Sequence, residues 1–306
     1  MKKSYSAWAP THTYHRGKDG NVLFYSNLDR LIYFSIFCTE ARNREIVVLA
    51  LTLMFTHIHQ LCSAESIETI LDVEKESARK YARAFNEAAG LSGDLFQHPI
   101  GWACKKTTKQ IRSTLAYIAN NLVEKKLTKR AEDSRWTFIA YAESDHPFSE
   151  KIRMEQASSK MRKAVRMVKW MAGKNKPLTY PLLKTLMQDL TPSEKNQLTD
   201  KIISLYSVIN HKRSTGFFGG YKNMIQAFTT TTGADYDIPE PQEASTDTAY
   251  VKMARMVQET GYSAVRKQFL KAGTEELQEL VRRFMGECHA SAYQIRRFLH
   301  LPPPPK

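Results

Sequence analysis

The stretch that decides the fold is residues 46–60, which read IVVLALTLMFTHIHQ. Its first nine residues are aliphatic and rich in β-branched side chains, a composition typical of a buried strand. Side chains two residues apart on a strand point to the same face. If a strand resumes after Phe55 and Thr56, the imidazoles of His57 and His59 therefore project side by side. Two such imidazoles can hold a divalent metal ion, although a pair of histidines alone also fits ordinary buried positions.

Length and charge place this stretch in a large, basic protein. The chain has 306 residues, which predicts two or three domains, and a hydrophobic content of 42% is sufficient for a real core. The formal net charge is +14. A positive field of this size favours a polyanion, most commonly nucleic acid. No apolar run approaches the roughly 20 residues of a membrane helix, and we expect no membrane partner.

The N-terminus and the cysteines indicate a cytoplasmic protein. Residues 1–8 are basic but lack the apolar segment of a signal peptide. Cys38, Cys62, Cys104 and Cys288 are scattered, which predicts a reducing compartment without disulfides or a cysteine zinc site. With nucleic acid as the expected partner, we expect the protein in the cytoplasm, associated with the nucleoid.

The order of the expected elements predicts an α+β fold. Strand, helix, strand, strand, helix, hairpin, helix is the order of an antiparallel sheet with helices on one face. We expect strands at 9–16, 46–54 and 57–62, a helix from about Leu28 capped by Ser26 or Asn27, further helices at 66–89 and 105–126, and a hairpin or loop at 95–104.

The 105–126 helix carries a candidate nucleophile. Tyr117 and Asn121 are four residues apart and share a helix face, which is offset from the core stripe of Ile118 and Leu122. A tyrosine hydroxyl can attack phosphorus and form an ester that keeps the bond energy for rejoining. Such an attack needs a metal ion to polarise the phosphate, and two imidazoles with the Asn121 oxygen would suit Mg²⁺ or Mn²⁺. Taken alone, Tyr117 equally fits a packing residue at a helix edge.

Residues 9–141 together resemble the single-tyrosine HUH transposases, most closely the REP-associated tyrosine transposase branch. Four blocks are similar to the family pattern, and they occur in the family's order. They are 12–17 with Leu23-Phe24, like its opening strand and turn; 49–61, like its A-x-x-x-M-P-N-H-x-H-x-L strand pair; 95–97, like the start of its hairpin; and 117–121, like its Y-I-x-x-N-P helix, followed by the aromatic cluster at 136–138.

The sequence departs from the family pattern at two structural positions. The family's Pro-Asn before the first histidine is Phe55-Thr56 here, and its Pro after the asparagine is Leu122. Asn120 stands next to Asn121 as an alternative third ligand, and both the family spacing and the helix phase favour Asn121.

The resemblance implies a ferredoxin-like HUH catalytic domain and a transposase mechanism. A metal ion held by His57, His59 and Asn121 would orient a scissile phosphate of single-stranded DNA. Tyr117 would attack it, leaving a 5′-phosphotyrosine and a free 3′-OH, and the 3′-OH of a second strand would resolve the intermediate. The substrate would be DNA with hairpin or palindromic ends. Members of the family differ in dimerisation, so a homodimer stays an open alternative.

The chain beyond the catalytic region is expected to be all-α and to bind DNA. We divide the sequence into a catalytic domain at 1–147, a basic helical region at 148–232, an acidic linker at 233–249 and a small DNA-binding domain at 250–306. That last domain ends in a helix-turn-helix-like pair at 274–286 and 291–299, after a helix at 262–272. The expected DNA contacts are Arg16, Lys105, Lys106, Lys109, Arg162, Lys163, Arg166, Tyr293, Gln294, Arg296 and Arg297.

Two other functions stay open. The first is a non-catalytic DNA-binding regulator on a transposase scaffold, against which the intact His57, His59, Tyr117 and Asn121 argue. The second is a replication or conjugation initiator with the same chemistry. Such initiators usually carry a helicase or a larger origin-binding region, which this sequence lacks.

Overall fold

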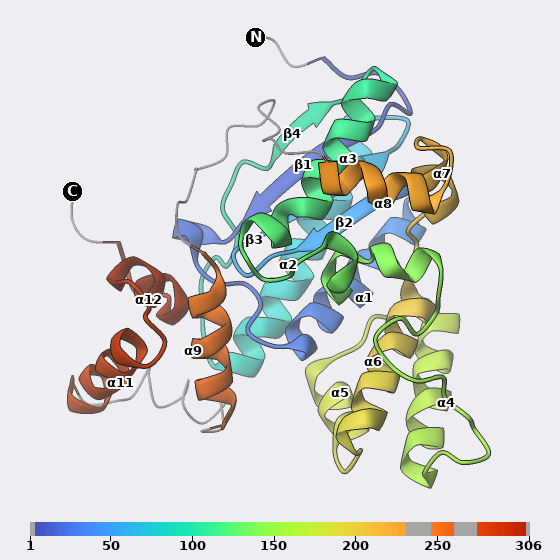
Figure 1. Ribbon diagram of the computed structural model, residues 1–306. Helices are drawn as coiled ribbons and strands as arrows, with labels where there is room; N and C mark the ends of the chain where they lie inside the picture. Colours follow the sequence, from blue (N-terminus) through green and yellow to red (C-terminus); the bar gives the residue numbers. More distant parts are fainter. Residues whose placement is uncertain (1–3, 231–245, 260–273, 304–306) are drawn as a thin grey trace.

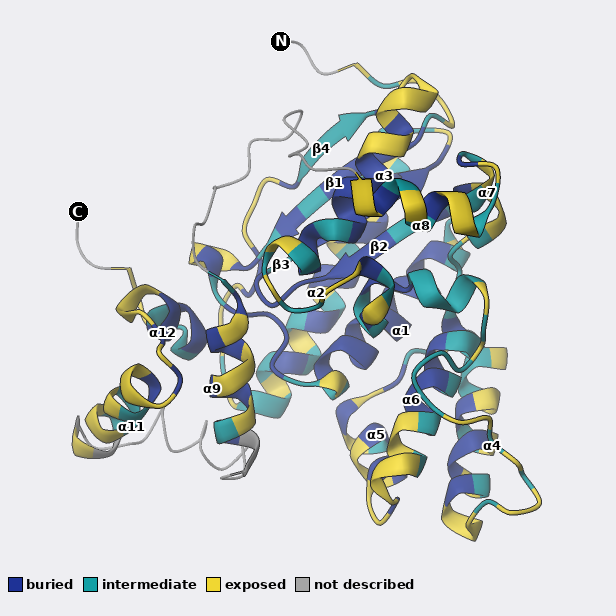
Figure 2. Ribbon diagram, in the orientation of Figure 1, coloured by how far each residue is buried: buried dark blue, intermediate teal, exposed yellow. Residues whose placement is uncertain are grey.

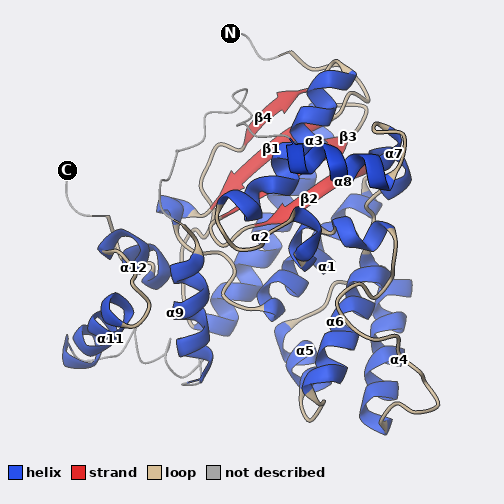
Figure 3. Ribbon diagram, viewed as in Figure 1, coloured by secondary structure: helices blue, strands red, loops and turns tan. Residues whose placement is uncertain are grey.

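A four-stranded antiparallel sheet lies at the centre of the N-terminal region. The computed structural model describes residues 4–230, 246–259 and 274–303. The α+β class and the antiparallel sheet predicted from the sequence are confirmed. The strands lie in the order β2-β3-β1-β4 (Figure 3) and span Thr11–Arg16 (β1), Val47–Leu53 (β2), His57–Ser63 (β3) and Gly101–Cys104 (β4).

Helices α1 (Asn27–Asn43) and α2 (Ile67–Ala89) connect the strands and cover one face of the sheet. Local chemistry explains where they begin, because Ser26 and Asp29 form a reciprocal capping box at α1 and Ser66 caps α2. The element order is therefore β-α-β-β-α-β. Ile58 and Cys62 of β3 are buried in the core that these two helices share with the sheet.

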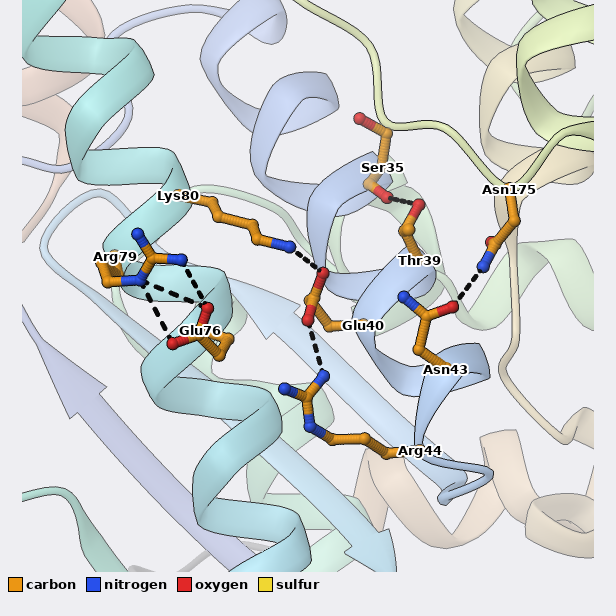
Figure 4. A network of polar contacts seen from close by, with 9 residues as sticks. All are labelled: Ser35, Thr39, Glu40, Asn43, Arg44, Glu76, Arg79, Lys80 and Asn175. Carbon is orange, nitrogen blue, oxygen red and sulfur yellow. Dashed lines mark hydrogen bonds and ion pairs between the residues drawn. The ribbon is translucent and has the colours of Figure 1, made fainter.

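A polar network ties α1 to its neighbours (Figure 4). Glu40, only 3% exposed, lies 2.6 Å from both Lys80 of α2 and Arg44. Farther along α1, Asn43 accepts a hydrogen bond of 2.7 Å from Asn175. Because buried charges are stable only when paired, the Glu40 cluster fixes how α1 and α2 lie against each other.

Helix α3 (Thr108–Glu124) covers the opposite face of the sheet, so the expectation of helices on one face only is wrong (Figure 1). Leu61 packs with Leu115 and Ile118 in a second core, and Thr52 Oγ1 donates a 2.9 Å hydrogen bond to the Ile118 carbonyl. The physical reason is that the sheet has apolar side chains on both faces, such as Leu51 of β2 in the first core and Leu49 of β2 in the second, and each face must be shielded from water. Helix α8 (Tyr221–Thr230) lies over α3.

The 148–232 helices share their core with the N-terminal region. Asp200 of α6 is fully buried and accepts hydrogen bonds from Arg135 Nε (2.8 Å), Tyr141 Oη (2.6 Å) and Ser149 Oγ (2.8 Å). The outward sides of these helices are exposed (Figure 2). Their bounds are Ser159–Gly173 (α4), Tyr180–Met187 (α5), Pro192–Tyr206 (α6) and His211–Gly216 (α7).

The C-terminal helices are α9 (Thr248–Glu259), α11 (Thr274–Gly286) and α12 (Ala292–Leu299). Helix α9 begins inside the range predicted as linker, and Ala249 is already buried. Residues 233–245 of that predicted linker lie outside the described residues, and so does the predicted helix 262–272. Within the described ranges, no helix is long and apolar enough to cross a membrane.

Helix α12 docks onto the connection between β1 and α1. Tyr25 Oη donates a 2.6 Å hydrogen bond to the Phe298 carbonyl, and the Val22 amide donates one of 3.1 Å to the Arg297 carbonyl. Farther along, His300 Nε2 lies 2.7 Å from the Val22 carbonyl oxygen. These contacts attach the end of the chain directly to the N-terminal region.

Candidate active site

The strand register places aromatic and basic side chains around the two histidines. Arg16 of β1 lies directly opposite His57 of β3, and Tyr14 lies opposite His59. Directly paired residues project from the same face of a sheet, which here is the face covered by α3. The Tyr14 ring is accordingly 5.3 Å from the His57 ring and 5.2 Å from the His59 ring, measured between centroids.

Hydrogen bonds to Nδ1 orient both imidazoles. His57 Nδ1 lies 3.0 Å from Thr56 Oγ1, and His59 Nδ1 lies 3.1 Å from His12 Nε2. A partner on one ring nitrogen sets which tautomer and which orientation the other nitrogen offers. Thr56 thus has a role of its own at the position where the sequence departs from the family pattern.

Helix α3 brings Tyr117 and Asn121 to the histidines. The Tyr117 ring meets the His59 ring edge-on, with the centroids 5.4 Å apart. Asn121 Nδ2 donates a 3.1 Å hydrogen bond to the Tyr117 carbonyl, and the Asn121 side chain lies close enough to His57 to influence the pKa of that histidine. The four residues predicted as nucleophile and metal ligands therefore lie together.

Burial and nearby positive charge keep both histidines neutral. Although part of the His57 side chain remains exposed, packing lowers its pKa to about 3, assisted by the charges of Lys125, Arg16 and Arg297. The pKa of His59 is also lowered well below its ordinary value, first by burial and then by His57 and His12. Neutral imidazole is the form that binds a metal ion.

The donor set fits a metal ion only if an amide oxygen takes part. Among the described residues, no group of three or more His, Cys, Asp and Glu side chains is arranged to hold a metal ion. Asn121 is not one of these four residue types, but its side chain lies close enough to His57 to influence the pKa of that histidine. Two neutral imidazoles with one amide oxygen suit a mixed nitrogen and oxygen site for Mg²⁺ or Mn²⁺.

Tyr117 and Asn121 are more buried than their position on the helix indicated. Tyr117 is 8% exposed and Asn121 5% exposed, whereas the sequence placed them on a face offset from the core. Tyr117 belongs to the same apolar cluster as Leu115 and Ile118. The reason is that the Tyr117 ring packs against the His12 and His59 rings of the sheet, whereas α8 covers another side of α3, where Asn120 Nδ2 donates a 2.8 Å hydrogen bond to the Phe228 carbonyl.

Two residues of the site have no role in the sequence-based prediction. His12 shares its strand face with Tyr14 and Arg16, and the alternation of β1 was the signal that could have identified it. Lys125 stands four residues after Asn121, and that helical spacing likewise indicated a side chain on the same face.

The predicted DNA contacts of the first 170 residues fall into four groups. Arg16 lies at the site itself. Lys106, Lys109, Lys163 and Arg166 are exposed and open to a polyanion. Lys105 is 1% exposed, and its prediction as a surface contact is therefore wrong. The remaining residue, Arg162, is half-buried and donates through Nη1 to the Ala157 carbonyl.

The helix-turn-helix prediction for α12 needs correction. Gln294 and Arg297 are buried, at 4% and 0% exposed, because α12 packs its inner side against the rest of the protein. Arg296 donates a 2.7 Å hydrogen bond to the Asp19 carbonyl. Of the four side chains predicted to read DNA, Tyr293 is the most open, at 49% exposed.

Comparisons with known proteins give limited information. No protein-family model matches the sequence, and no curated protein matches it. Among solved structures, the chain is similar to one described as the structure of the REP-associated tyrosine transposase bound to a REP hairpin. The sequence identity is 16%, the match covers 44% of this chain and 79% of that chain, and the TM-score is 0.36. At this TM-score the similarity carries no information about activity.

Proposed function

We propose that the protein is a DNA strand transferase of the single-tyrosine HUH type, built on a ferredoxin-like domain. Its substrate is single-stranded DNA with hairpin or palindromic ends. The Tyr117 hydroxyl oxygen gives up its proton and forms a bond to phosphorus while the P–O3′ bond breaks. The 3′ oxygen leaves as a hydroxyl by taking up one proton, which balances the proton released by Tyr117. In the reverse sense, an incoming 3′-OH re-forms the P–O3′ bond and releases Tyr117.

The surrounding side chains prepare the site for a phosphate. His57, His59 and Asn121 would hold Mg²⁺ or Mn²⁺, which supplies Lewis-acid polarisation of the phosphate. Lys125 and Arg16 lie close enough to His57 to lower its pKa, and the same two charges would offset the negative charge of the phosphate oxygens. His12 and Thr56 orient the imidazoles of His59 and His57 through contacts with their Nδ1 atoms.

One observation carries this proposal: Tyr117 and Asn121 of α3 lie against His57 and His59 of β3. The two pairs come from elements far apart in sequence, and a packing tyrosine alone would not require neutral imidazoles and an amide on the same side. The 8% exposure of Tyr117 sets a condition, since DNA binding must open a path to its hydroxyl.

The same burial favours a second candidate function, that of a non-catalytic DNA-binding regulator. A tyrosine buried between α3 and the sheet can serve packing alone. In that case the exposed basic residues would bind DNA and the histidine cluster would be structural.

A denaturing gel with end-labelled single-stranded DNA carrying hairpin ends separates the two. In Mg²⁺ or Mn²⁺ the proposal expects a covalent adduct with wild type and none with Tyr117→Phe, and the His57→Ala/His59→Ala variant should lose cleavage but keep binding. An adduct that persists in Tyr117→Phe removes this nucleophile. Binding without any cleavage by wild type across matched hairpin substrates favours the regulator.

A further inference from the structure

Helix α4 presents basic side chains along its exposed side. Residues 159–176, which comprise α4 and the start of the connection to α5, contain seven Lys or Arg residues and no Asp or Glu. Figure 2 shows the outward side of this helix open to solvent. Four of its cations are fully exposed, and we call them the basic row: Lys163, Arg166, Lys169 and Lys174.

Packing of the opposite side of α4 fixes the direction of the basic row. Met161, Val165 and Val168 are buried, at 0%, 2% and 0% exposed, and α4 packs on α6. Because the first three cations of the row are three residues apart, they lie along one side of the helix, away from this apolar side. The row is therefore held outward by the core of the helical region.

The charge of the basic row is not neutralised locally. Lys160, at the start of α4, lies 2.7 Å from Asp189, but in the described ranges no carboxylate is within ion-pair distance of the four cations of the row. Beside the row, a hollow of about 120 Å³ between α4 and α6 is lined by Lys151, Lys169 and Lys201, and Asp145 is 3.5 Å from Lys201 alone. Concentrated positive charge of this kind attracts a polyanion.

The composition of this surface favours nucleic acid over an acidic protein. Protein interfaces have an apolar centre and are depleted in lysine. Trp170, at 52% exposed, is the one large apolar side chain of α4 that is fully exposed, and Lys176 Nζ lies 5.4 Å from the centroid of its ring. The indole N–H of Trp170 can donate a hydrogen bond to a phosphate oxygen, as the neighbouring lysines can.

The shape of the surface favours double-stranded over single-stranded DNA. Single strands are typically held in a groove that offers several aromatic rings for stacking, whereas α4 offers the convex side of one helix with a single ring. From Lys163 to Lys174 the helix rises by about 16 Å. A DNA duplex carries one charge per roughly 1.7 Å of its axis, so the row can meet several phosphates without reading any base.

The basic row lies far from the candidate site (Figure 1). Helix α4 packs on α6, α6 packs on α1, and α1 covers one face of the sheet, whereas α3 and the candidate site lie on the other face. Packed helices are about 8–10 Å apart, so two helix layers and the sheet separate the row from Tyr117. A DNA segment along α4 and a strand at the histidines can therefore be bound at the same time.

We infer that the basic row is a surface for double-stranded DNA, which holds a second DNA segment while another occupies the candidate site. The second-segment part rests on the proposed function, whereas duplex binding by the row does not.

Fluorescence anisotropy with a labelled duplex of arbitrary sequence tests duplex binding. The variant Lys163→Glu/Arg166→Glu/Lys169→Glu should bind at least tenfold more weakly than wild type, with a salt slope smaller by about 2–3. The control, Lys75→Glu/Arg83→Glu/Arg282→Glu, makes the same charge change at exposed positions on α2 and α11 and should bind like wild type. If the test variant misfolds by circular dichroism, the corresponding triple glutamine variant replaces it. Equal binding by the test and control variants overturns the surface.

A bridging assay tests the second segment. Protein captured on beads that carry an unpaired single strand should retain a labelled duplex, in a Tyr117→Phe background so that no cleavage intervenes. The row variant should stay on the beads but lose the duplex. Retention of the duplex by the row variant, as two copies of one DNA site would produce, overturns the second-segment role, and so does the absence of any retention by the parent.

Two further measurements identify the occupant. A duplex with an azidophenacyl group on its backbone should crosslink within residues 159–176 of the full-length protein, as mapped by mass spectrometry, and crosslinks confined to other segments overturn the assignment. Polyglutamate that binds through the row without displacing the duplex shows a surface for an acidic protein instead.

The surface and the proposed chemistry can fail separately. If wild type forms no covalent adduct with hairpin substrates yet the row variant loses duplex binding, the chemistry fails and the surface stands. If wild type forms the adduct and the row variant binds duplex like the control, the chemistry stands and the surface is overturned.

Discussion

His12 Nε2 lies 3.1 Å from Nδ1 of His59, a candidate metal ligand, and this contact should affect the affinity for the metal ion. Partners that orient a ligating histidine typically contribute about 10–100-fold in metal affinity. We expect His12→Ala to weaken Mn²⁺ binding by that range in isothermal titration calorimetry, and His12→Gln, which restores a polar group, to recover part of the loss. The exposed His98 supplies the control, His98→Ala. Unchanged affinity in His12→Ala would mean that the contact does not orient His59.

Gly20 and Arg297 couple the two ends of the chain sterically. Gly20 has a φ of +72°, and a Cβ added there would lie 1.9 Å from Arg297 Nη2. Gly20→Ala should therefore lower the free energy of unfolding by about 1–3 kcal/mol, from overpacking and left-handed backbone strain. In an Arg297→Ala background the loss should shrink by roughly 0.5–2 kcal/mol, because the clashing guanidinium is gone. Denaturant titration of the four proteins measures the coupling. Equal losses in both backgrounds would leave backbone strain as the whole effect.

Glu74 gives the fold a pH dependence that one substitution can isolate. It is 1% exposed, accepts a hydrogen bond from Thr13 Oγ1 and lies 3.9 Å from His15 Nδ1. Burial raises its pKa from 4.5 to about 7, so the folded state binds this proton more tightly than the unfolded state. The resulting stabilisation is complete below about pH 4.5 and is lost as the pH rises through 7.

We therefore expect Glu74→Gln to gain stability relative to wild type as the pH rises. The difference in unfolding free energy should change by on the order of 3 kcal/mol across that interval and then level off. His15, with a pKa lowered to about 3 by burial and by His98, acts in the opposite direction but is present in both proteins. Urea titrations at several pH values between 4.5 and 8 measure the difference. A difference that does not vary with pH would show that Glu74 does not titrate in this interval.

The exposed lysines at the start of α3 should contribute to DNA binding through charge alone. Lys106→Glu/Lys109→Glu should weaken single-stranded DNA binding and reduce the salt slope by about 0.7 for each phosphate that the variant no longer neutralises. Lys75→Glu on α2, at the other side of the sheet, is the matched control for each charge reversal. Anisotropy titrations at several salt concentrations give the slopes, and a slope identical to that of the control would exclude these two lysines from the interface.

Much of the local structure could be predicted because its causes are local. The alternation of β3 put His57 and His59 on one face, and the spacing of Tyr117 and Asn121 put them on one side of α3. Ser26, one of the two residues predicted to cap the first helix, is the N-cap of α1. Each of these features depends on residues within a few positions of one another.

The remaining features depend on contacts between distant segments, which no local pattern contains. That α3 covers the second face of the sheet follows from apolar side chains on both faces of the sheet. Tyr117 is consequently buried against His12 and His59. The docking of α12 is the clearest case, because Tyr25 and Phe298 are 273 residues apart and yet share a hydrogen bond. The sequence by itself determined which side chains could form a histidine, asparagine and tyrosine site. Only the tertiary structure decided that His12 and Lys125 adjoin it and that Arg297 is buried near it, since burial and long-range packing set these relationships.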